Sequence, residues 1–300
     1  MEITLTTHGE VAQLLKAMAS PLTRTPEVVD RYYTLCIPFY REFLGRHWHT
    51  GFYAPAGPIG PADQLCMELR VASSACVGPG TSVLDVGCGI GGTACHLAQA
   101  TGARVHGVTP NAMQLELARE HSRDRGLEQR ATFSRGTADA LPFPDQSFDV
   151  VLFFESACHF PDRPHFFSEV SRVLRPGGRV AGEDWIATSG LDATQRQKFI
   201  VPICDTWAIP DLGTLESYAD AMASVGLQVH ERVDMRQEMA LRRGFIVDVE
   251  ARRQVQREID GCGDPIRSLI MKALLILGDA VAHGAFTIGR FLATKPGAAA

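Results

Sequence analysis

Residues 83–92 read Val-Leu-Asp-Val-Gly-Cys-Gly-Ile-Gly-Gly, an apolar segment with one acid followed by four closely spaced glycines. Glycine lets the backbone turn with positive φ or approach a ligand closely. An apolar strand that ends in such a turn and leads into a helix is the nucleotide-binding connection of parallel α/β sheets. Asp85 adds a carboxylate that can accept hydrogen bonds from a cationic or amide-bearing ligand. The segment predicts a nucleotide site; the alternative is a tight strand-to-helix turn without a ligand.

The next apolar segment, residues 103–109, ends in Thr109 rather than in an acid. A dinucleotide site normally carries an acidic residue about 20 positions after the glycines, where it holds the ribose hydroxyls. The pattern therefore disfavours NAD and the dehydrogenases that use it.

Ionisable side chains follow two later apolar segments: Glu155 and His159 after the first, and Asp184 within the second. A carboxylate beside Phe154 would be desolvated, which raises its pKa and makes it a better base near neutral pH. We expect Glu155 and His159 to handle a proton, with Asp184 in a similar role. In the alternative interpretation, Glu155 only binds cofactor and His159 is a buried side chain satisfied by one carbonyl.

The apolar segments between residues 81 and 185 alternate between strand-like and helix-like periods, which is typical of a parallel sheet with crossover helices. The expected strands of this part are 83–86, 104–108, 131–134, 150–154 and 179–183, and the expected helices are 92–101, 111–125 and 162–174.

Helical patterns also flank this part of the chain. We expect an N-terminal helical cap segment over 1–76, and a core over 77–300 that carries cap insertions at about 190–222 and 240–282. Two closing strands are expected at 226–235 and 285–293. Ligands of open parallel sheets bind beyond the carboxyl ends of the strands, so the cap should close over that edge.

The glycine run resembles motif I of the class I S-adenosyl-L-methionine (SAM) methyltransferases, and three further family motifs follow it in order. They are residues 106–111 with Gln114, residues 141–149 and residues 174–178. The resemblance implies an α/β, Rossmann-like class I methyltransferase fold: a seven-stranded, mostly parallel sheet with one antiparallel strand, plus a helical cap. It implies SAM as cofactor and S-adenosylhomocysteine as product.

Three further segments narrow the resemblance to the sterol C24 and gamma-tocopherol C-methyltransferase group. Tyr33 and the run from 47 to 53 look like the cap entry of these small-molecule enzymes. Residues 155–161 resemble the acid-x-x-Cys-His-x-Pro segment of sterol methyltransferases, and residues 183–185 resemble their acid-Trp pair.

The resemblance implies a set of cofactor-binding residues. Asp85 and the glycine backbone would hold the methionine end, Thr109 with Gln114 the ribose, and Thr137 or the Ala138 amide the adenine. The alternative for Thr137 is a loop residue that caps its own backbone. The full cofactor set is Tyr33, Asp85, Gly87, Cys88, Gly89, Thr109, Gln114, Thr137, Ala138 and Glu155, and the catalytic set is Glu155, His159, Asp184 and Tyr33.

The residues expected around the methyl acceptor favour methylation of a carbon atom over methylation of an oxygen. Related sugar O-methyltransferases often carry a second histidine where this chain has Cys158, and a buried thiol is a poor general base. An alkene attacks a sulfonium directly and needs a base only afterwards. Such a substrate predicts an apolar pocket whose aromatic faces stabilise positive charge by ~0.5–2 kcal/mol each. The candidates, which could alternatively be ordinary core residues, are Tyr40, Phe160, Trp185, Ile203 and Trp207.

These observations predict C-methylation of an alkene carbon in a prenyl or terpenoid small molecule of secondary metabolism. The resulting carbocation would lose a proton, with or without cyclisation. The alternatives are an O- or N-methyltransferase of a natural product and a non-catalytic SAM-binding subunit.

The composition of the chain limits the kinds of partner that the protein is expected to bind. The chain has 300 residues, a formal net charge of −5 and no basic footprint for nucleic acid. No apolar stretch is long enough for stable membrane insertion, and no signal peptide is evident, so we expect a cytoplasmic protein with a hydrophobic small-molecule substrate. Eight cysteines without a Cys-x-x-Cys pair indicate reduced thiols, and His47 with His49 is the only histidine cluster, so no metal is expected. The sequence leaves open whether the protein forms a homo-oligomer through its N-terminal helix.

Overall fold

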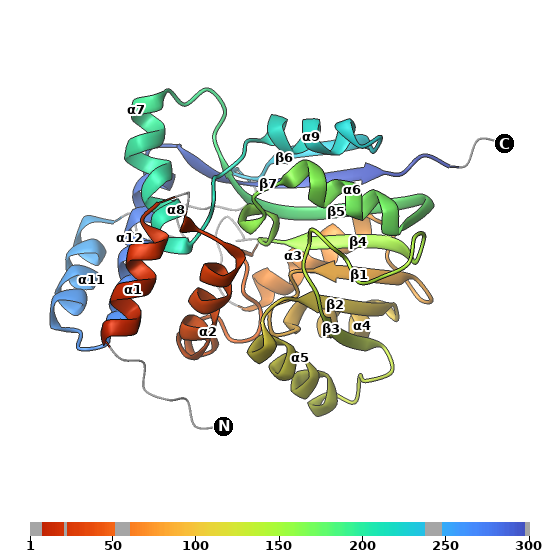
Figure 1. The fold of residues 1–300 in the computed structure, drawn as a ribbon, viewed down its shortest axis with the longest axis horizontal. Helices are drawn as coiled ribbons and strands as arrows, with labels where there is room; N and C mark the ends of the chain where they lie inside the picture. The colour runs from red at the N-terminus through yellow and green to blue at the C-terminus, as the bar shows by residue number, and fades with distance from the viewer. Residues whose placement is uncertain (1–7, 21–22, 52–60, 238–247, 298–300) are drawn as a thin grey trace.

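The computed structural model describes residues 8–20, 23–51, 61–237 and 248–297. Within them, one sheet is covered by helices on both faces and by a separate group of helices at one edge (Figure 1). Two parts of the sequence-based expectations, the end of the cap-entry segment at 52–53 and the start of the insertion at 240–247, lie outside the described residues.

The sheet has seven strands in the order β3-β2-β1-β4-β5-β7-β6. Neighbours from β3 to β5 pair in parallel, whereas β7 lies between β5 and β6 and is antiparallel to both. The expected mostly parallel sheet with one antiparallel strand is therefore confirmed. The strands are β1 (Ser82–Val86), β2 (Arg104–Thr109), β3 (Ala131–Arg135), β4 (Phe148–Phe154), β5 (Leu174–Ala187), β6 (Gln228–Asp234) and β7 (Phe286–Thr294).

Two apolar clusters attach the helices to the two faces of the sheet. One cluster joins β1 and β2 to α3, α4 and α5, and the other joins β1, β4 and β5 to α6 and α9. Strands covered on both faces are apolar on both faces, which explains the nearly continuous burial of β1 and β4. The covering helices are α3 (Pro61–Ser74), α4 (Gly92–Thr101), α5 (Ala112–Asp124), α6 (Arg163–Val173) and α9 (Leu215–Ser224).

The remaining helices form the cap, which lies beyond the carboxyl ends of the parallel strands (Figure 1). Helices α7 and α8 form one continuous helix through a π-helical turn, and α12 packs against α8, α11 and β7. The members are α1 (His8–Met18), α2 (Pro26–Phe43), α7 (Ala193–Gln195), the π-helical turn η3 (Arg196–Ile200), α8 (Val201–Trp207), α11 (Val249–Gly261) and α12 (Pro265–Ala282).

Two helices predicted within cap segments lie on the sheet instead. Helix α3 falls within the N-terminal segment 1–76 but packs against α4 and β5, with Met67 and Val71 fully buried. Helix α9 overlaps the predicted insertion at 190–222 but packs against α6 and β6, because Tyr218 and Met222 on one face are fully buried there. The helical pattern alone did not reveal which surface each apolar face would meet.

Residues 46–51, which follow α2, are packed against the starts of α3 and α4. A Cβ atom on Gly92 would lie 1.9 Å from the Arg46 carbonyl oxygen, and one on Gly51 would lie 2.6 Å from the backbone of Asp63 and Gln64. The Gln64 side chain donates hydrogen bonds to the carbonyls of His47 and His49. Residues 46–51, here called the entry loop, are therefore fixed against the core.

We predict that Gly92→Ala destabilises the protein even though alanine is the better helix former, because the new methyl group collides with the Arg46 backbone. Overpacking of this kind costs about 1–3 kcal/mol of unfolding free energy. Urea unfolding measures the change, with Gly78→Ala as the control, since no atom lies within 4 Å of a Cβ at Gly78. Equal stability of Gly92→Ala and wild type would show that the entry loop is not packed against α4.

Candidate functional site

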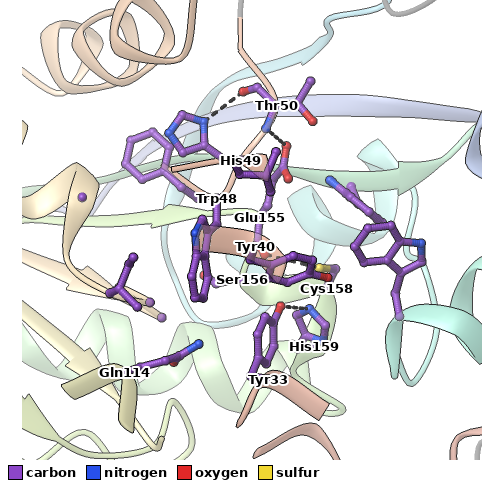
Figure 2. Close-up of a pocket in the computed structure, with 18 of the residues that line it drawn as sticks. Tyr33, Tyr40, Trp48, His49, Thr50, Gln114, Glu155, Ser156, Cys158 and His159 are labelled. Carbon is purple, nitrogen blue, oxygen red and sulfur yellow. Dashed lines mark hydrogen bonds between the residues drawn. The ribbon is translucent and has the colours of Figure 1, made fainter. Parts of the chain in front are cut away.

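A cavity of about 440 Å³ lies between the carboxyl edge of the sheet and the cap. Its lining comes from the ends of β1, β2, β4 and β5 on one side and from α2, the entry loop, α8, α11 and α12 on the other (Figure 2). The expectation that the cap closes over this edge is therefore confirmed for the described residues.

The glycine turn after β1 forms part of the cavity floor. Gly87 has φ +80°, and a Cβ there would lie 2.4 Å from the Ser156 side chain. Ser156 follows β4 and donates from Oγ to the Val86 carbonyl over 2.7 Å. Only glycine allows this close approach, which joins the ends of β1 and β4 and leaves the turn backbone open to the cavity.

Asp85 places a buried carboxylate at the same end of β1. Its side chain is 2% exposed, and its Oδ2 atom has no hydrogen-bond partner among the described residues. Burial, together with the charge of Glu68, raises the pKa of Asp85 to about 7. A buried acceptor without a partner is costly, so Asp85 is suited to a ligand that brings a cationic donor.

The end of β2 presents a second polar group. Thr109 donates from Oγ1 to Gln114 Oε1 over 2.7 Å, and Figure 2 shows the Gln114 side-chain nitrogen pointing toward the cavity. Asn111 caps α5 and also donates to Thr34 Oγ1 and to the Asp30 carbonyl on α2. The two residues predicted to hold a ribose therefore lie together, beneath the cap helix α2.

Glu155 faces the cavity from a strained turn after β4. Its φ is +45°, a conformation that is uncommon and energetically costly for a residue other than glycine. Its Oε1 atom accepts a hydrogen bond of 2.6 Å from the Thr50 amide of the entry loop. Burial raises the pKa of Glu155, and the neighbouring charge of His49 opposes the increase.

Tyr33 and His159 meet across the cavity. The Tyr33 hydroxyl and His159 Nε2 are joined by a hydrogen bond of 2.7 Å (Figure 2). Burial lowers the pKa of His159 to about 4 and raises that of Tyr33 well above its usual value. Both groups are therefore neutral near pH 7.

Aromatic rings form the opposite wall. Tyr40 stacks on Trp207 with ring centroids 6.2 Å apart, and Trp207 meets Trp185 edge-on at 4.9 Å. Trp48 packs edge-on against Tyr40 at 5.3 Å. Phe160 also lines the cavity. Four of the five predicted pocket residues, Tyr40, Phe160, Trp185 and Trp207, are thus brought to one cavity.

The structure places the other predicted site residues outside it. Ile203 is fully buried in the core, and Ile209 lines the cavity instead. Thr137 and Ala138 are not among the lining residues, and Thr137 forms a short bridge with Ala140, in line with the alternative of a loop residue.

Asp184 also lies behind the cavity wall. It accepts hydrogen bonds from the backbone amides of Cys158 and Trp185 and from the Tyr218 hydroxyl, and burial raises its pKa to about 7. Successive residues of a strand point to opposite faces, so Trp185 faces the cavity and Asp184 the α9 side. The position in sequence after a strand did not distinguish these two directions.

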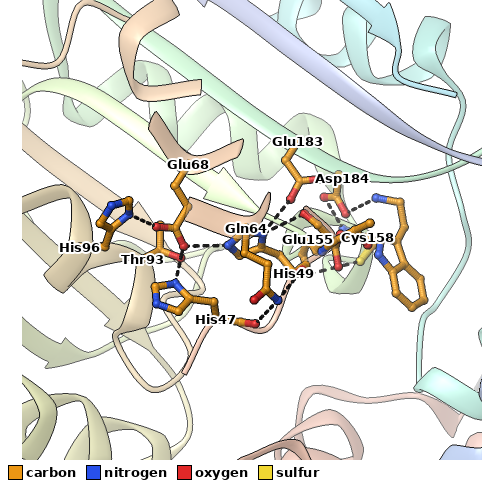
Figure 3. Close-up of polar contacts among 12 residues, drawn as sticks. His47, His49, Gln64, Glu68, Thr93, His96, Glu155, Cys158, Glu183 and Asp184 are labelled. Atoms are coloured by element: carbon orange, nitrogen blue, oxygen red, sulfur yellow. Dashed lines mark hydrogen bonds and ion pairs between the residues drawn. The ribbon is translucent and has the colours of Figure 1, made fainter. Parts of the chain in front are cut away.

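Sequence reasoning missed a cluster centred on Glu68 of α3. This fully buried carboxylate lies within hydrogen-bond distance of His47, His49, His96 and Thr93 (Figure 3). The spacing of His47 and His49 placed both on one side of the entry loop. A single glutamate in a helix gave no sign of being their partner.

The cluster has the residue types of a metal site but the distances of hydrogen bonds. His47, His49 and Glu68 offer three ligand atoms within 4.8 Å of one another. The His47 and His49 nitrogens lie only 2.6 and 2.7 Å from Glu68 Oε1. Ligands held tetrahedrally around zinc at its usual bond lengths are ~3.3 Å apart. The contacts are therefore read as hydrogen bonds.

No helix of the described residues has the length and apolar character needed to cross a membrane.

Comparison with known proteins finds relatives in sequence, of which two are described here. The methyltransferase domain family matches residues 84–182. Methyltransferase GfsG of Streptomyces halstedii is 34% identical over 215 residues, which cover 69% of this chain and 75% of that protein. Sterol 24-C-methyltransferase of Eremothecium gossypii is 33% identical over 227 residues, covering 74% of this chain and 60% of that protein. The chain thus spans less than two thirds of the sterol relative's length.

A solved structure shares the fold. Geranyl diphosphate C-methyltransferase from Streptomyces coelicolor A3(2), determined with Mg²⁺, geranyl diphosphate and S-adenosylhomocysteine, superposes with a TM-score of 0.67. The match covers 92% of this chain and 99% of that chain at 18% identity. At this identity the likeness establishes the fold alone.

The environment of His159 predicts that its imidazole stays neutral well below the usual range. Because its folded pKa of about 4 lies below the ordinary value of about 6.5, the unfolded chain binds this proton first. The contribution of His159 to the unfolding free energy therefore falls as the pH drops from about 6.5 toward 4. NMR of ¹⁵N-histidine protein, assigned with His159→Gln, measures the titration. A midpoint near 6.5 would contradict the buried placement.

Proposed function

Because the chain belongs to the class I SAM-dependent methyltransferases, in the group that includes the sterol C24-methyltransferases, we propose that it methylates an alkene carbon of a prenyl or terpenoid small molecule of secondary metabolism. The observation that carries the proposal is the composition of the cavity: a carboxylate on a strained turn faces a wall made of aromatic rings. SAM, when bound, supplies an electrophilic methyl group, so that a carbon–carbon bond forms as a sulfur–carbon bond breaks and S-adenosylhomocysteine remains.

The residues at the ends of β1 and β2 fit the cofactor. The unpartnered Oδ2 of Asp85 would accept from the ammonium of the methionine end, and the open backbone at Gly87 lets that end approach. Gln114, oriented by Thr109, would donate to the ribose. The adenine contact predicted for Thr137 is not proposed again, since that residue lies outside the cavity lining.

The opposite wall fits an apolar, electron-rich acceptor. Tyr40, Trp185 and Trp207 cover much of it and exclude water from the reacting carbon. Methylation of an alkene leaves a positive charge on the adjacent carbon, and aromatic faces stabilise a desolvated cation. The names of two similar proteins also favour a carbon acceptor, because the sterol and geranyl diphosphate enzymes are both named C-methyltransferases.

Glu155 is the proposed acceptor of the final proton. It lines the cavity, is fixed by the Thr50 amide, and has a pKa raised by burial, which strengthens it as a base. The adjacent carbon–hydrogen bond of the cation would break, its electrons forming the new double bond while the proton moves to Glu155. The neutral Tyr33–His159 pair would orient the acceptor beside it.

The same neutral pair supports a second candidate. A His159 nitrogen that is not protonated can take the proton of a bound hydroxyl, which is the requirement of O-methylation. The position of the new methyl group in the product therefore decides between carbon and a heteroatom.

The cofactor assignment predicts that Asp85→Asn weakens SAM binding about 10- to 100-fold, since a hydrogen bond between charged groups is worth ~1.5–3 kcal/mol. The pKa of Asp85 is about 7 without a ligand, and a cation binds only its ionised form. Wild-type affinity should therefore fall as the pH drops below 7, and that of Asp85→Asn should not. Calorimetry measures both, with Thr137→Ala as a control expected to bind normally. Normal binding by Asp85→Asn would refute the assignment.

The acceptor assignment is tested with methyl-labelled SAM and the acceptors farnesol, geranyl diphosphate and squalene. We expect mass spectrometry and NMR to place the label on carbon, and Glu155→Gln to lower turnover by about 10²–10⁴-fold while SAM affinity changes little. Glutamine keeps the acceptor for the Thr50 amide, so the fold is retained.

Label on oxygen or nitrogen would replace the alkene with a heteroatom acceptor. Failure to form S-adenosylhomocysteine with every acceptor would favour the non-catalytic SAM-binding subunit. Full turnover by Glu155→Gln would remove Glu155 from the mechanism.

A further inference from the structure

His49 has hydrogen-bond acceptors on both of its ring nitrogens. Nε2 lies 2.7 Å from Glu68 Oε1, and Nδ1 lies 2.9 Å from the carbonyl oxygen of Thr50. A carbonyl cannot donate, and a neutral imidazole carries only one N–H. Either His49 is an imidazolium or the Glu68 carboxyl is protonated.

The surroundings of Glu68 decide between these states. Besides His49, it faces His47 Nδ1 at 2.6 Å and the Thr93 hydroxyl at 2.8 Å, with His96 Nδ1 on its second oxygen (Figure 3). Three of these contacts meet on Oε1 and one on Oε2, and hydrogen bonds from the histidines hold the pKa of Glu68 well below its usual value although burial opposes the charge. Glu68 is therefore ionised and His49 carries the positive charge.

This charge lies one residue from the group that holds Glu155. Thr50 accepts from His49 through its carbonyl and donates to Glu155 Oε1 through its amide over 2.6 Å. The His49 ring also packs against Phe154, the residue before Glu155, with centroids 5.5 Å apart. His49 and Glu155 are therefore connected in two places: through the backbone of Thr50, and through the contact between the His49 ring and Phe154.

We propose that His49 is a positioning residue: a buried imidazolium, anchored on Glu68, that keeps Glu155 ionised and directed into the cavity. The functional importance of this pair rests on the proposed role of Glu155 as proton acceptor. Its electrostatic part can be tested without any acceptor.

The other groups around Glu155 do not supply positive charge. The titratable groups that interact with it are the acids Glu183 and Asp184, the hydroxyls of Tyr33 and Tyr40, the thiol of Cys158 and the imidazolium of His49. His49 is faced by Asp85 from β1, Glu68 from α3 and Glu183 from β5, and the half-buried Arg163 faces Asp184 and Cys158. Without His49, these neighbours would favour the protonated, uncharged form of Glu155.

Glu183 of β5 is a second acid of this cluster, and its Oε1 atom lies 3.9 Å from His49 Nδ1. It is fully buried, and neither carboxylate oxygen has a hydrogen-bond partner among the described residues. Burial and the nearby acids Glu155 and Asp184 raise the pKa of Glu183 well above its ordinary value. By contrast, although burial opposes a charge on His49, its hydrogen bond to Glu68 holds the pKa of His49 above the usual value.

The test measures ionisation directly, in the full-length protein without ligands. The carboxyl carbons of ¹³C-glutamate protein are titrated by NMR, and the Glu155 signal is assigned by its loss in Glu155→Gln. A unit charge several ångströms away at an effective dielectric constant of ~20 is worth about one to two pH units. We therefore expect the Glu155 midpoint to rise by about that much in His49→Gln and in Glu68→Gln.

His47→Gln is the matched control, because His47 bonds the same Glu68 oxygen without reaching Thr50 or Glu155. It should leave the Glu155 midpoint unchanged. In wild type, ¹⁵N spectra should show both His49 nitrogens protonated at pH 8. Thermal unfolding of each variant identifies any that has lost the fold, and for such a variant the wild-type ¹⁵N spectrum still decides the charge of His49.

An unchanged Glu155 midpoint in His49→Gln, a neutral His49 at pH 8, or one equivalent of bound transition metal in the purified protein would each overturn the proposal. These outcomes are separate from failure of the proposed function. If Glu155→Gln retains full turnover, the role of Glu155 fails whatever its midpoint. If it loses turnover while His49→Gln shows no shift, only the positioning role of His49 fails.

Discussion

The hydrogen bonds that converge on Glu68 are the interaction on which the site depends. A buried carboxylate is costly unless its oxygens are filled. Here the donors come from the entry loop and from α4, while the carboxylate itself comes from α3. Filling the oxygens therefore requires the entry loop to lie against the core. Once it does, Thr50 reaches Glu155, and the cap is closed over the carboxyl edge of the sheet.

The cavity combines two environments that a uniform pocket could not provide. Near the glycine turn, Asp85 and Gln114 present polar groups to a charged ligand. Toward α8, the wall formed by Tyr40, Trp185 and Trp207 is aromatic. The two environments meet at Glu155, where the proposed function brings the methyl donor, the apolar acceptor and the proton acceptor together.

Much of the fold could be predicted because local patterns and tertiary structure agree along the core. The glycine turn, the strand ends and the residues Asp85, Thr109, Gln114 and Glu155 all lie where the order of motifs implied. The predictions failed where a choice depended on the partner surface. Asp184 and Trp185 are adjacent in sequence but face opposite sides of β5, and only packing against α9 decides which one meets the cavity. Glu68 could not be identified from the sequence, because its partners lie 19 to 28 residues away along the chain.

The left-handed backbone at Glu155 has a consequence for the evolution and engineering of this chain. A non-glycine residue in a sparsely populated conformation costs of order 1–3 kcal/mol, and glycine would relieve most of it. Selection for stability alone would therefore favour glycine at this position, as would a design procedure that scores only folding. Under the proposed role of Glu155 as proton acceptor, stability and function favour different residues at position 155. A homologue with glycine at this position would keep the fold but would lack the proposed proton acceptor.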